Sequence, residues 1–150
     1  MTSAAQIAAS VCAAVNLAAG IVGAYAWWRG TTGAAGRAFW PLCRAGQITA
    51  GALALLAGVA ILTGYDAPSS LLYLSLILPI VVSVFAEQLR LAAAQTILDQ
   101  HDMESAQDME ALDAAGQRSI VLAIVGREIG ILAISGFVIA FLALRVLGTL

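Results

Sequence analysis

A glutamate and an arginine one helical turn apart follow directly on a very apolar stretch of the chain. The segment LLYLSLILPIVVSV runs without a break into FAEQLRLAAAQ, which carries Glu87 and Arg90. On a helix these positions, i and i+3, lie on one face and can form an ion pair. Charged groups within a membrane are unfavourable and usually serve ion, proton or substrate binding. The pair therefore marks either a working site inside a membrane or the point where a helix reaches water.

The composition is that of an integral membrane protein. Of 150 residues, 61% are hydrophobic and only 11% are charged, and the mean hydropathy is +0.94. A soluble domain is about half apolar and about a quarter charged. The formal net charge of -2 predicts no nucleic-acid partner.

Charged and polar residues divide the chain into apolar blocks of about twenty residues, the length that crosses about 30 Å of hydrocarbon as a helix. No block alternates with the period of a strand, and backbone in lipid must satisfy its own hydrogen bonds, so we expect helices. The first block lacks the basic residues that open a signal peptide. We predict an all-α, four-helix integral membrane bundle that forms one domain over residues 1–150. The predicted spans are about 6–28, 44–63, 70–90 and 120–147.

The links predict how the helices are connected and oriented. Short links favour antiparallel neighbours, so we expect an up-down-up-down bundle. Helices three and four are expected to extend into a cytoplasmic acidic hairpin at about 97–117, where Ser105 and Asp108 together could start a short helix. This loop could dock a basic cytoplasmic partner.

Arginine is the only basic side chain apart from one histidine, and its distribution is asymmetric. Only Arg145 falls on one side, so the positive-inside rule places both termini outside. Arginine without lysine, with abundant alanine, suggests a GC-rich coding sequence, and we expect the inner (plasma) membrane of a bacterium. Trp27, Trp28 and Trp40 fall at the inner boundary. The arginines on that side are Arg29, Arg37, Arg44, Arg90, Arg118 and Arg127.

Small residues at i, i+4 spacing predict where the helices meet, because helices in lipid associate through close packing and hydrogen bonds. The fourth span opens with Gly126 and Gly130, and the third carries a polar stripe that we expect to face the interior. Pro79 in that stripe removes a backbone donor, which predicts a kink. The stripes are Ala8, Cys12, Asn16, Gly20 and Ala24; Gly46, Ala50, Ala54 and Gly58; and Ser75, Pro79, Ser83 and Glu87.

Several polar and ionic residues are expected near one depth at the inner boundary. Geometrically reasonable cross-helix pairs are Glu87 with Arg127 or Arg90 with Glu128. Such pairs can hold the helices together whether these residues form a functional site or only mark the membrane boundary. The candidate cluster consists of Asn16, Arg44, Gln47, Ser83, Glu87, Arg90, Arg127 and Glu128.

The sequence contains no pattern for catalysis, a cofactor or a metal. Cys12 and Cys43 are far apart, and no CxxC exists. His101 is the only histidine, so we expect neither haem held by paired histidines nor a three-histidine zinc site. No phosphate-binding glycine motif occurs. We predict no cofactor, no metal and no catalytic residue.

Three hypotheses for function remain. The leading one is a non-catalytic membrane protein that acts by helix association, as a homo-oligomer or as an accessory subunit of a membrane complex, with lipids as its surroundings. The second is a small transporter or channel that uses the polar cluster near the inner leaflet. The third is a membrane enzyme that acts on a lipid or quinone.

Overall fold

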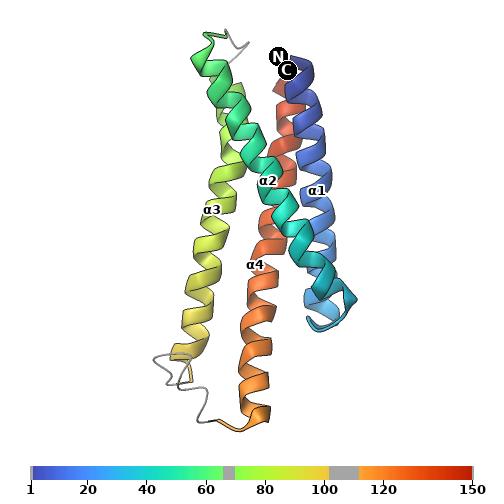
Figure 1. Cartoon of the computed structure of the whole chain (residues 1–150), viewed down its shortest axis with the longest axis vertical. Helices are drawn as coiled ribbons and strands as arrows, with labels where there is room; N and C mark the ends of the chain where they lie inside the picture. The colour runs from blue at the N-terminus through green and yellow to red at the C-terminus, as the bar shows by residue number, and fades with distance from the viewer. Residues whose placement is uncertain (1, 66–69, 102–111, 150) are drawn as a thin grey trace.

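The computed structural model describes residues 2–65, 70–101 and 112–149, and these ranges are helical apart from short turns. Four helices follow in order: α1 (Thr2–Arg29), α2 (Ala34–Leu62), α3 (Ser70–Asp99) and α4 (Ala114–Thr149) (Figure 1). Each of the four is long and apolar enough to cross a membrane. The prediction of an all-α chain with four membrane-length helices is confirmed.

The helices continue beyond the predicted spans. α2 begins at Ala34 rather than near Arg44, α3 runs on to Asp99, and α4 begins at Ala114. The predicted limits followed hydrophobicity, which measures the length that lipid can cover. A helix extends further wherever alanine, leucine, glutamine and arginine follow, because these residues favour helix in water as well.

Glycines in the left-handed region follow the first two helices. Gly30 has a φ of 108° and Gly64 a φ of 65°. Only glycine adopts such angles without strain, and it commonly ends a helix in this way. The amide of Gly30 donates to the carbonyl of Ala26, and that of Gly64 donates to Ile61. The turn between α1 and α2 is therefore built by local backbone geometry.

The two ends of the chain lie at the same end of the molecule (Figure 1). α1 packs against α2 and α4, and α3 packs against α4 and α2. Towards the opposite end, α3 and α4 continue past the turn between α1 and α2 (Figure 1). There Ile97 and Ile120 form a small apolar cluster, joined by Leu98, Leu112 and Ile124. The predicted helix start at Ser105 and Asp108 lies outside the described residues, so the acidic hairpin stays a prediction.

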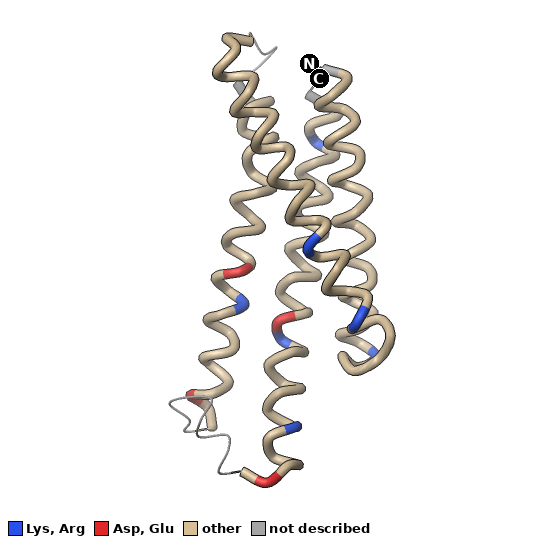
Figure 2. The backbone as a smooth tube through the Cα atoms, viewed as in Figure 1, with Lys and Arg blue, Asp and Glu red and all other residues tan. Residues whose placement is uncertain are grey.

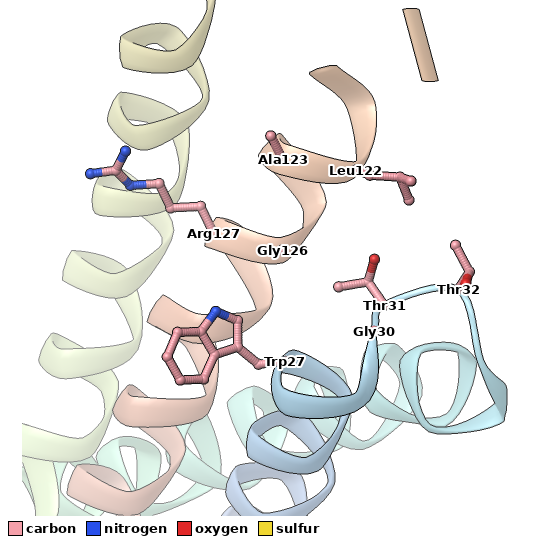
Figure 3. A pocket seen from close by; sticks show the side chains of 8 residues that line it. All are labelled: Trp27, Gly30, Thr31, Thr32, Leu122, Ala123, Gly126 and Arg127. Atoms are coloured by element: carbon pink, nitrogen blue, oxygen red, sulfur yellow. The ribbon is translucent and has the colours of Figure 1, made fainter. Parts of the chain in front are cut away.

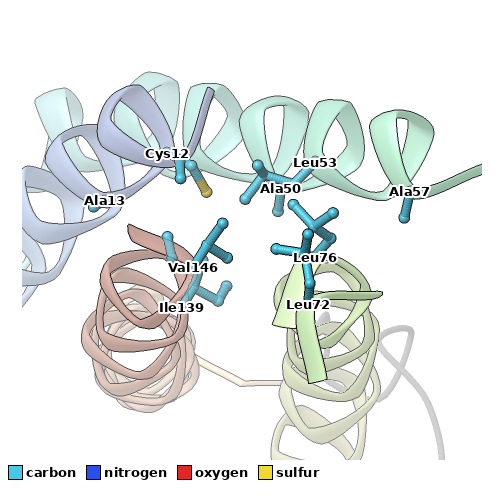
Figure 4. Packing of buried hydrophobic residues seen from close by; sticks show 11 residues of the cluster. Cys12, Ala13, Ala50, Leu53, Ala57, Leu72, Leu76, Ile139 and Val146 are labelled. Carbon is cyan, nitrogen blue, oxygen red and sulfur yellow. The ribbon is translucent and has the colours of Figure 1, made fainter. Parts of the chain in front are cut away.

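The main apolar core lies towards the end that holds the termini, since it includes Ala9 near the start of α1 and Val146 near the end of α4. Figure 4 shows its side chains packed between the helices. Leu53, Ile139 and Val146 are almost completely buried there. All four helices contribute, so this cluster holds the bundle together where few polar side chains are available. Its buried members are Ala9, Cys12, Ala13, Ala50, Leu53, Ala57, Leu72, Leu76, Ile139, Ala143 and Val146. A second buried cluster closer to the turn consists of Ala26, Phe39, Cys43, Ala86, Ile129 and Leu132.

Small residues bring α1 close to both of its neighbours. A Cβ on Gly46 would lie 2.5 Å from the Asn16 side-chain oxygen, and one on Gly136 would lie 3.0 Å from the Asn16 carbonyl oxygen. Cys12, Asn16 and Gly20 are buried as expected from their stripe. Gly136 was not anticipated, although its lack of a side chain is what allows α4 to approach the backbone of α1.

Two of the other expected stripes need correction. In α2, Gly46 and Ala50 are buried, but Ala54 and Gly58 are only half-buried, and no atom lies within 4 Å of a Cβ built on Gly58. In α4, Gly130 lies under the indole of Trp27 rather than against a helix backbone, and Gly126 faces open space beside Thr31. Spacing identified small residues, but the rotation of each helix decided which of them face a neighbour.

The polar stripe of α3 faces the interior as predicted. Ser75 and Ser83 are 3% and 5% exposed, and the ring of Pro79 is fully buried between them. α3 is a single helix that contains Pro79. The stripe ends at Glu87, whose side chain is still 25% exposed.

Candidate functional site

Glu87 is the centre of a polar network that joins α2 and α3. Its Oε1 accepts a hydrogen bond from Arg44 Nη1 at 3.1 Å and another from the side-chain amide of Gln47. Its Oε2 accepts from Arg90 Nε at 2.8 Å, which is the expected i, i+3 pair on α3. Arg44 also donates to Gln47 Oε1 at 2.6 Å, so the two α2 side chains are held in place together. Both carboxylate oxygens of Glu87 are thus engaged by α2 and α3.

Arg90 extends the network to α4. Its Nη1 lies 3.5 Å from Glu128 Oε1, and the two side chains are 21% and 15% exposed. This confirms the predicted pair between Arg90 and Glu128. Two guanidinium groups, from Arg44 and Arg90, are matched by two carboxylates, from Glu87 and Glu128. The network is neutral as a whole and connects three helices.

The other predicted cross-helix pair, Glu87 with Arg127, does not form. Glu87 is occupied by Arg44 and Arg90, and Arg127 forms no ion pair or hydrogen bond with any described residue. Successive residues on a helix point about 100° apart, since a turn holds about 3.6 residues. Glu128 faces α3, so its neighbour Arg127 must face elsewhere. Only one of the two charges could join the network.

Asn16 and Ser83 also lie apart from the ionic network. The amide of Asn16 donates to the carbonyl oxygens of Cys12, at 2.9 Å, and Gly46, at 3.2 Å. It is 3% exposed and joins α1 to α2 through a hydrogen bond rather than through charge. Ser83 is buried one turn before Glu87 and has no contact with the ionic side chains among the interactions described. Of the candidate residues, the structure brings together Arg44, Gln47, Glu87, Arg90 and Glu128.

Arg127 lines a cavity of about 540 Å³ beside the turn between α1 and α2 (Figure 3). In the figure, Arg127 lies on one side of Gly126 and the two threonines lie on the other, with the Trp27 indole below both. The lining residues are Trp27, Gly30, Thr31, Thr32, Leu122, Ala123, Gly126 and Arg127. None of the paired ionic side chains is among them.

The sequence did not predict this cavity, because the segment GTTGAAGRA (residues 30–38) matches no phosphate-binding glycine motif. A signal was present in the type of its residues. Thr31 and Thr32 are hydroxyl donors that follow the exposed Trp27 and Trp28 within a few positions. The distance in sequence from Thr31 to Arg127 hid their proximity, which only the packing of α1 on α4 creates.

The residues that could hold a metal or react chemically are dispersed. Within the described ranges, no group of three or more histidine, cysteine, aspartate or glutamate side chains could hold a metal ion. Cys12 and Cys43 are both free and buried, and they belong to different apolar clusters. His101 has a ring nitrogen 2.8 Å from the carbonyl oxygen of Ile97, at the end of α3.

The chain matches no family model, and no curated protein or solved structure is significantly similar to it. The assignment of a function therefore depends on the arrangement of its own residues.

Proposed function

We propose that this chain is a non-catalytic, multi-pass membrane protein that acts by helix association, with a second copy of itself as the partner. The coarse part of this statement follows from four helices of membrane length and composition. The observation that carries the finer part is the outward face of α2. Ile48, Leu55 and Leu62 are 74%, 72% and 88% exposed there.

Two glycines alternate with these large residues. Gly51 and Gly58 have no atom within 4 Å of the place where a Cβ would stand. Glycine lowers the stability of a helix interior by about 1 kcal/mol relative to alanine, and no neighbour in the described part of the chain fills the space beside these two glycines. Glycines allow close approach between helices in lipid, where van der Waals contact drives association.

The spacing of this face supports a helix as its occupant. The five positions 48, 51, 55, 58 and 62 repeat with a period of seven residues, as the contact positions of two packed helices do. A second copy offers the same alternation of large side chains and glycine notches. The face is therefore complementary to itself, and this favours a homo-oligomer over an accessory subunit.

The ionic network supports a structural rather than a catalytic role. Glu87 is engaged by Arg44, Gln47 and Arg90, and Arg90 also reaches Glu128. Pairs of this kind hold helices in register, since breaking one leaves an unpaired charge in a poorly solvated place. A transporter or a lipid or quinone enzyme would need these groups to face a substrate, which gives those two hypotheses less support.

The proposed arrangement in the membrane is up-down-up-down in a bacterial inner membrane, with both termini outside. Six of the seven arginines support it by the positive-inside rule. Figure 2 shows most of the basic positions, in blue, in the half of the molecule away from the termini, with one close to the termini. A basic cytoplasmic partner at residues 97–117 stays a proposal, because most of that segment lies outside the described residues.

The test is the mass of the protein in lipid nanodiscs, measured by native mass spectrometry. We expect the wild-type chain to be a multimer of itself. Gly51→Leu together with Gly58→Leu should fill both notches and shift the mass to that of a monomer. Gly148→Leu is the matched control, because Gly148 also faces open space but lies at the end of α4. A monomeric wild-type chain would overturn self-association, and a multimer insensitive to Gly51 and Gly58 would exclude this face.

A different chain that co-purifies in fixed ratio, and is lost with the same double substitution, would replace the homo-oligomer by an accessory subunit.

Transport is tested separately by flux in proteoliposomes, with Glu87→Gln as the variant. Flux that depends on Glu87 would favour the transport hypothesis over association.

A further inference from the structure

We propose that an anionic phospholipid binds beside the turn between α1 and α2, with its phosphate in the cavity next to Arg127 and one acyl chain in the groove between α1 and α4. This proposal does not depend on self-association. It requires only that the chain lie in a membrane.

Unpaired hydrogen-bond donors surround the cavity. Arg127 is exposed and has no partner among the described residues, and the same holds for the hydroxyl groups of Thr31 and Thr32. Arginine binds phosphate strongly because its guanidinium presents parallel donors to two oxygens. No acidic side chain is among the described residues that line it. The donors around this cavity therefore suit an anion.

The volume suits a lipid headgroup. The cavity measures about 540 Å³, and sites for small molecules commonly measure about 300–1,000 Å³. Trp27, which lines it, is 62% exposed, and the next residue in the chain, Trp28, is 82% exposed. Tryptophan concentrates at the level of the headgroups in membrane proteins, so the cavity lies where lipid phosphates are found.

An apolar groove adjoins this cavity on the side of the membrane core. It measures about 160 Å³, and Trp27 lines both spaces. From Trp27, the groove continues one turn back along α1 to Ala24 and forward along α4 from Gly130 to Phe137. Its walls are carbon throughout, since the lining residues are Ala24, Trp27, Gly130, Ala133, Ile134 and Phe137.

The two spaces together distinguish a lipid from a free anion. A phosphate ion would use only the polar cavity, whereas a phospholipid uses the donors and the groove at once. Ile134 and Phe137 are 66% and 39% exposed, so the groove is open to the surrounding lipid. Basic pockets between transmembrane helices on the cytoplasmic side bind acidic lipid headgroups in this manner.

The guanidinium of Arg127 extends away from Thr31 in Figure 3, which places these donors on opposite rims of the cavity. An exposed arginine without a partner can change rotamer at little cost. A phosphate held by Thr31 and Thr32 would attract it, and the bound state would bring the two rims together around one anion.

Binding can be measured by quenching of Trp27 with phosphatidylglycerol brominated on its acyl chains. The chain carries Trp28→Phe and Trp40→Phe, so that Trp27 is the only tryptophan left. In nanodiscs of phosphatidylcholine, we expect saturable quenching as brominated phosphatidylglycerol is added. Brominated phosphatidylcholine should quench only in proportion to its amount. Equal quenching by the two lipids would overturn the proposal.

Variants assign the site. Arg127→Gln should weaken phosphatidylglycerol binding about tenfold, the loss expected for one charged hydrogen bond, and Arg127→Lys should restore most of it. Arg118→Gln, an exposed arginine of α4 outside the cavity, should change nothing. An Arg127→Gln variant that binds as the wild type, with helix content unchanged by circular dichroism, would overturn the site.

A second variant and a competitor test separately the contributions of the phosphate and of the acyl chain to binding. Gly126→Leu fills the cavity without removing a charge, and we expect it to abolish the preference for phosphatidylglycerol over phosphatidylcholine. Glycerol 1-phosphate carries the same phosphate without a tail and should compete only at concentrations far above those of the lipid. Competition at equal concentration would replace the lipid by a soluble phosphate ester.

Discussion

Arg127 and Glu128 are adjacent in the chain but belong to different parts of the molecule. Glu128 Oε1 lies 3.5 Å from Arg90 Nη1 on α3, whereas Arg127 lines the cavity beside the turn between α1 and α2. The rotation of α4 thus assigns one charge to holding helices together and leaves the other for a ligand. The following predictions test this division and the packing around it.

Replacing Glu87 should destabilise the bundle more than replacing an exposed acid. Glu87→Gln preserves the size of the side chain but leaves Arg44 without its counter-charge and Arg90 with only Glu128, at 3.5 Å. We expect the free energy of unfolding to fall by about 1.5–3 kcal/mol, the range for hydrogen bonds to charged groups. Unfolding in mixed micelles of increasing SDS fraction measures it. Asp99→Asn at the exposed end of α3 should change it by less than about 0.5 kcal/mol, and equal effects would contradict a central role for Glu87.

Arg90 and Glu128 should be energetically coupled across α3 and α4. The double-mutant cycle uses Arg90→Gln and Glu128→Gln. The losses of unfolding free energy in the two single variants should add up to more than the loss in the double variant. Residues in one network commonly couple by about 0.5–3 kcal/mol, and the 3.5 Å separation favours the lower end. The same SDS titration provides all four free energies. Strict additivity would show that the network ends at Glu87.

Replacing two glycines of α2 by alanine should change the free energy of unfolding in different directions. Gly46→Ala places a methyl group 2.5 Å from the Asn16 oxygen and should destabilise the protein by about 1–3 kcal/mol. Within the single chain Gly51→Ala meets open space, so the unfolding free energy of the monomer should stay unchanged or rise by up to about 1 kcal/mol, because alanine favours helix. A comparable loss for both variants would mean that α1 and α2 do not meet at Gly46.

The hydrogen bonds of Asn16 should make a small but measurable contribution to the free energy of unfolding. Asn16→Ala removes its donation to the Gly46 carbonyl. Hydrogen bonds between helices in membranes average about 0.6 kcal/mol, with a maximum near 1.7. Asn16→Ala should therefore destabilise by an amount in this range, well below the effect of Glu87→Gln. A loss above that of Glu87→Gln would make Asn16 the main polar contact.

Maleimide labelling tests the orientation. Cys12 and Cys43 are buried and should not react in intact cells or inverted vesicles. In a chain with both cysteines replaced by alanine, Thr32→Cys should react in inverted vesicles and Ser3→Cys in intact cells. The reverse pattern would place the termini in the cytoplasm, and reaction of both from one side would exclude an up-down-up-down path.

Part of the candidate site was accessible from the sequence. The i, i+3 pair of Glu87 and Arg90 depends only on helical geometry, and Arg44 with Gln47 follows in the same way. The pairing of Arg90 with Glu128 was one of two combinations that the sequence allowed. Glu87 with Arg127 was the other, and it failed because an adjacent residue on the same helix cannot face the same neighbour.

The small residues show the same limit. Cys12, Asn16 and Gly20 lie on a buried face of α1 as their spacing predicts. Gly58 shares its stripe with Gly46 but faces open space, and Gly136, outside any predicted stripe, lets α4 approach the backbone of α1. Spacing of four residues drifts around a helix, so a stripe that starts at a contact need not end at one.

By itself the sequence determined that the chain forms four long apolar helices and that most of its arginines lie towards one end. Both properties follow from local chemistry, because hydrophobic length and charge act residue by residue along the chain. Only the tertiary structure decided which charges pair, which glycines meet a neighbour, and that Trp27, Thr31 and Arg127 surround one cavity. Those outcomes depend on the rotation of each helix about its axis, which is set by the packing of all four helices together.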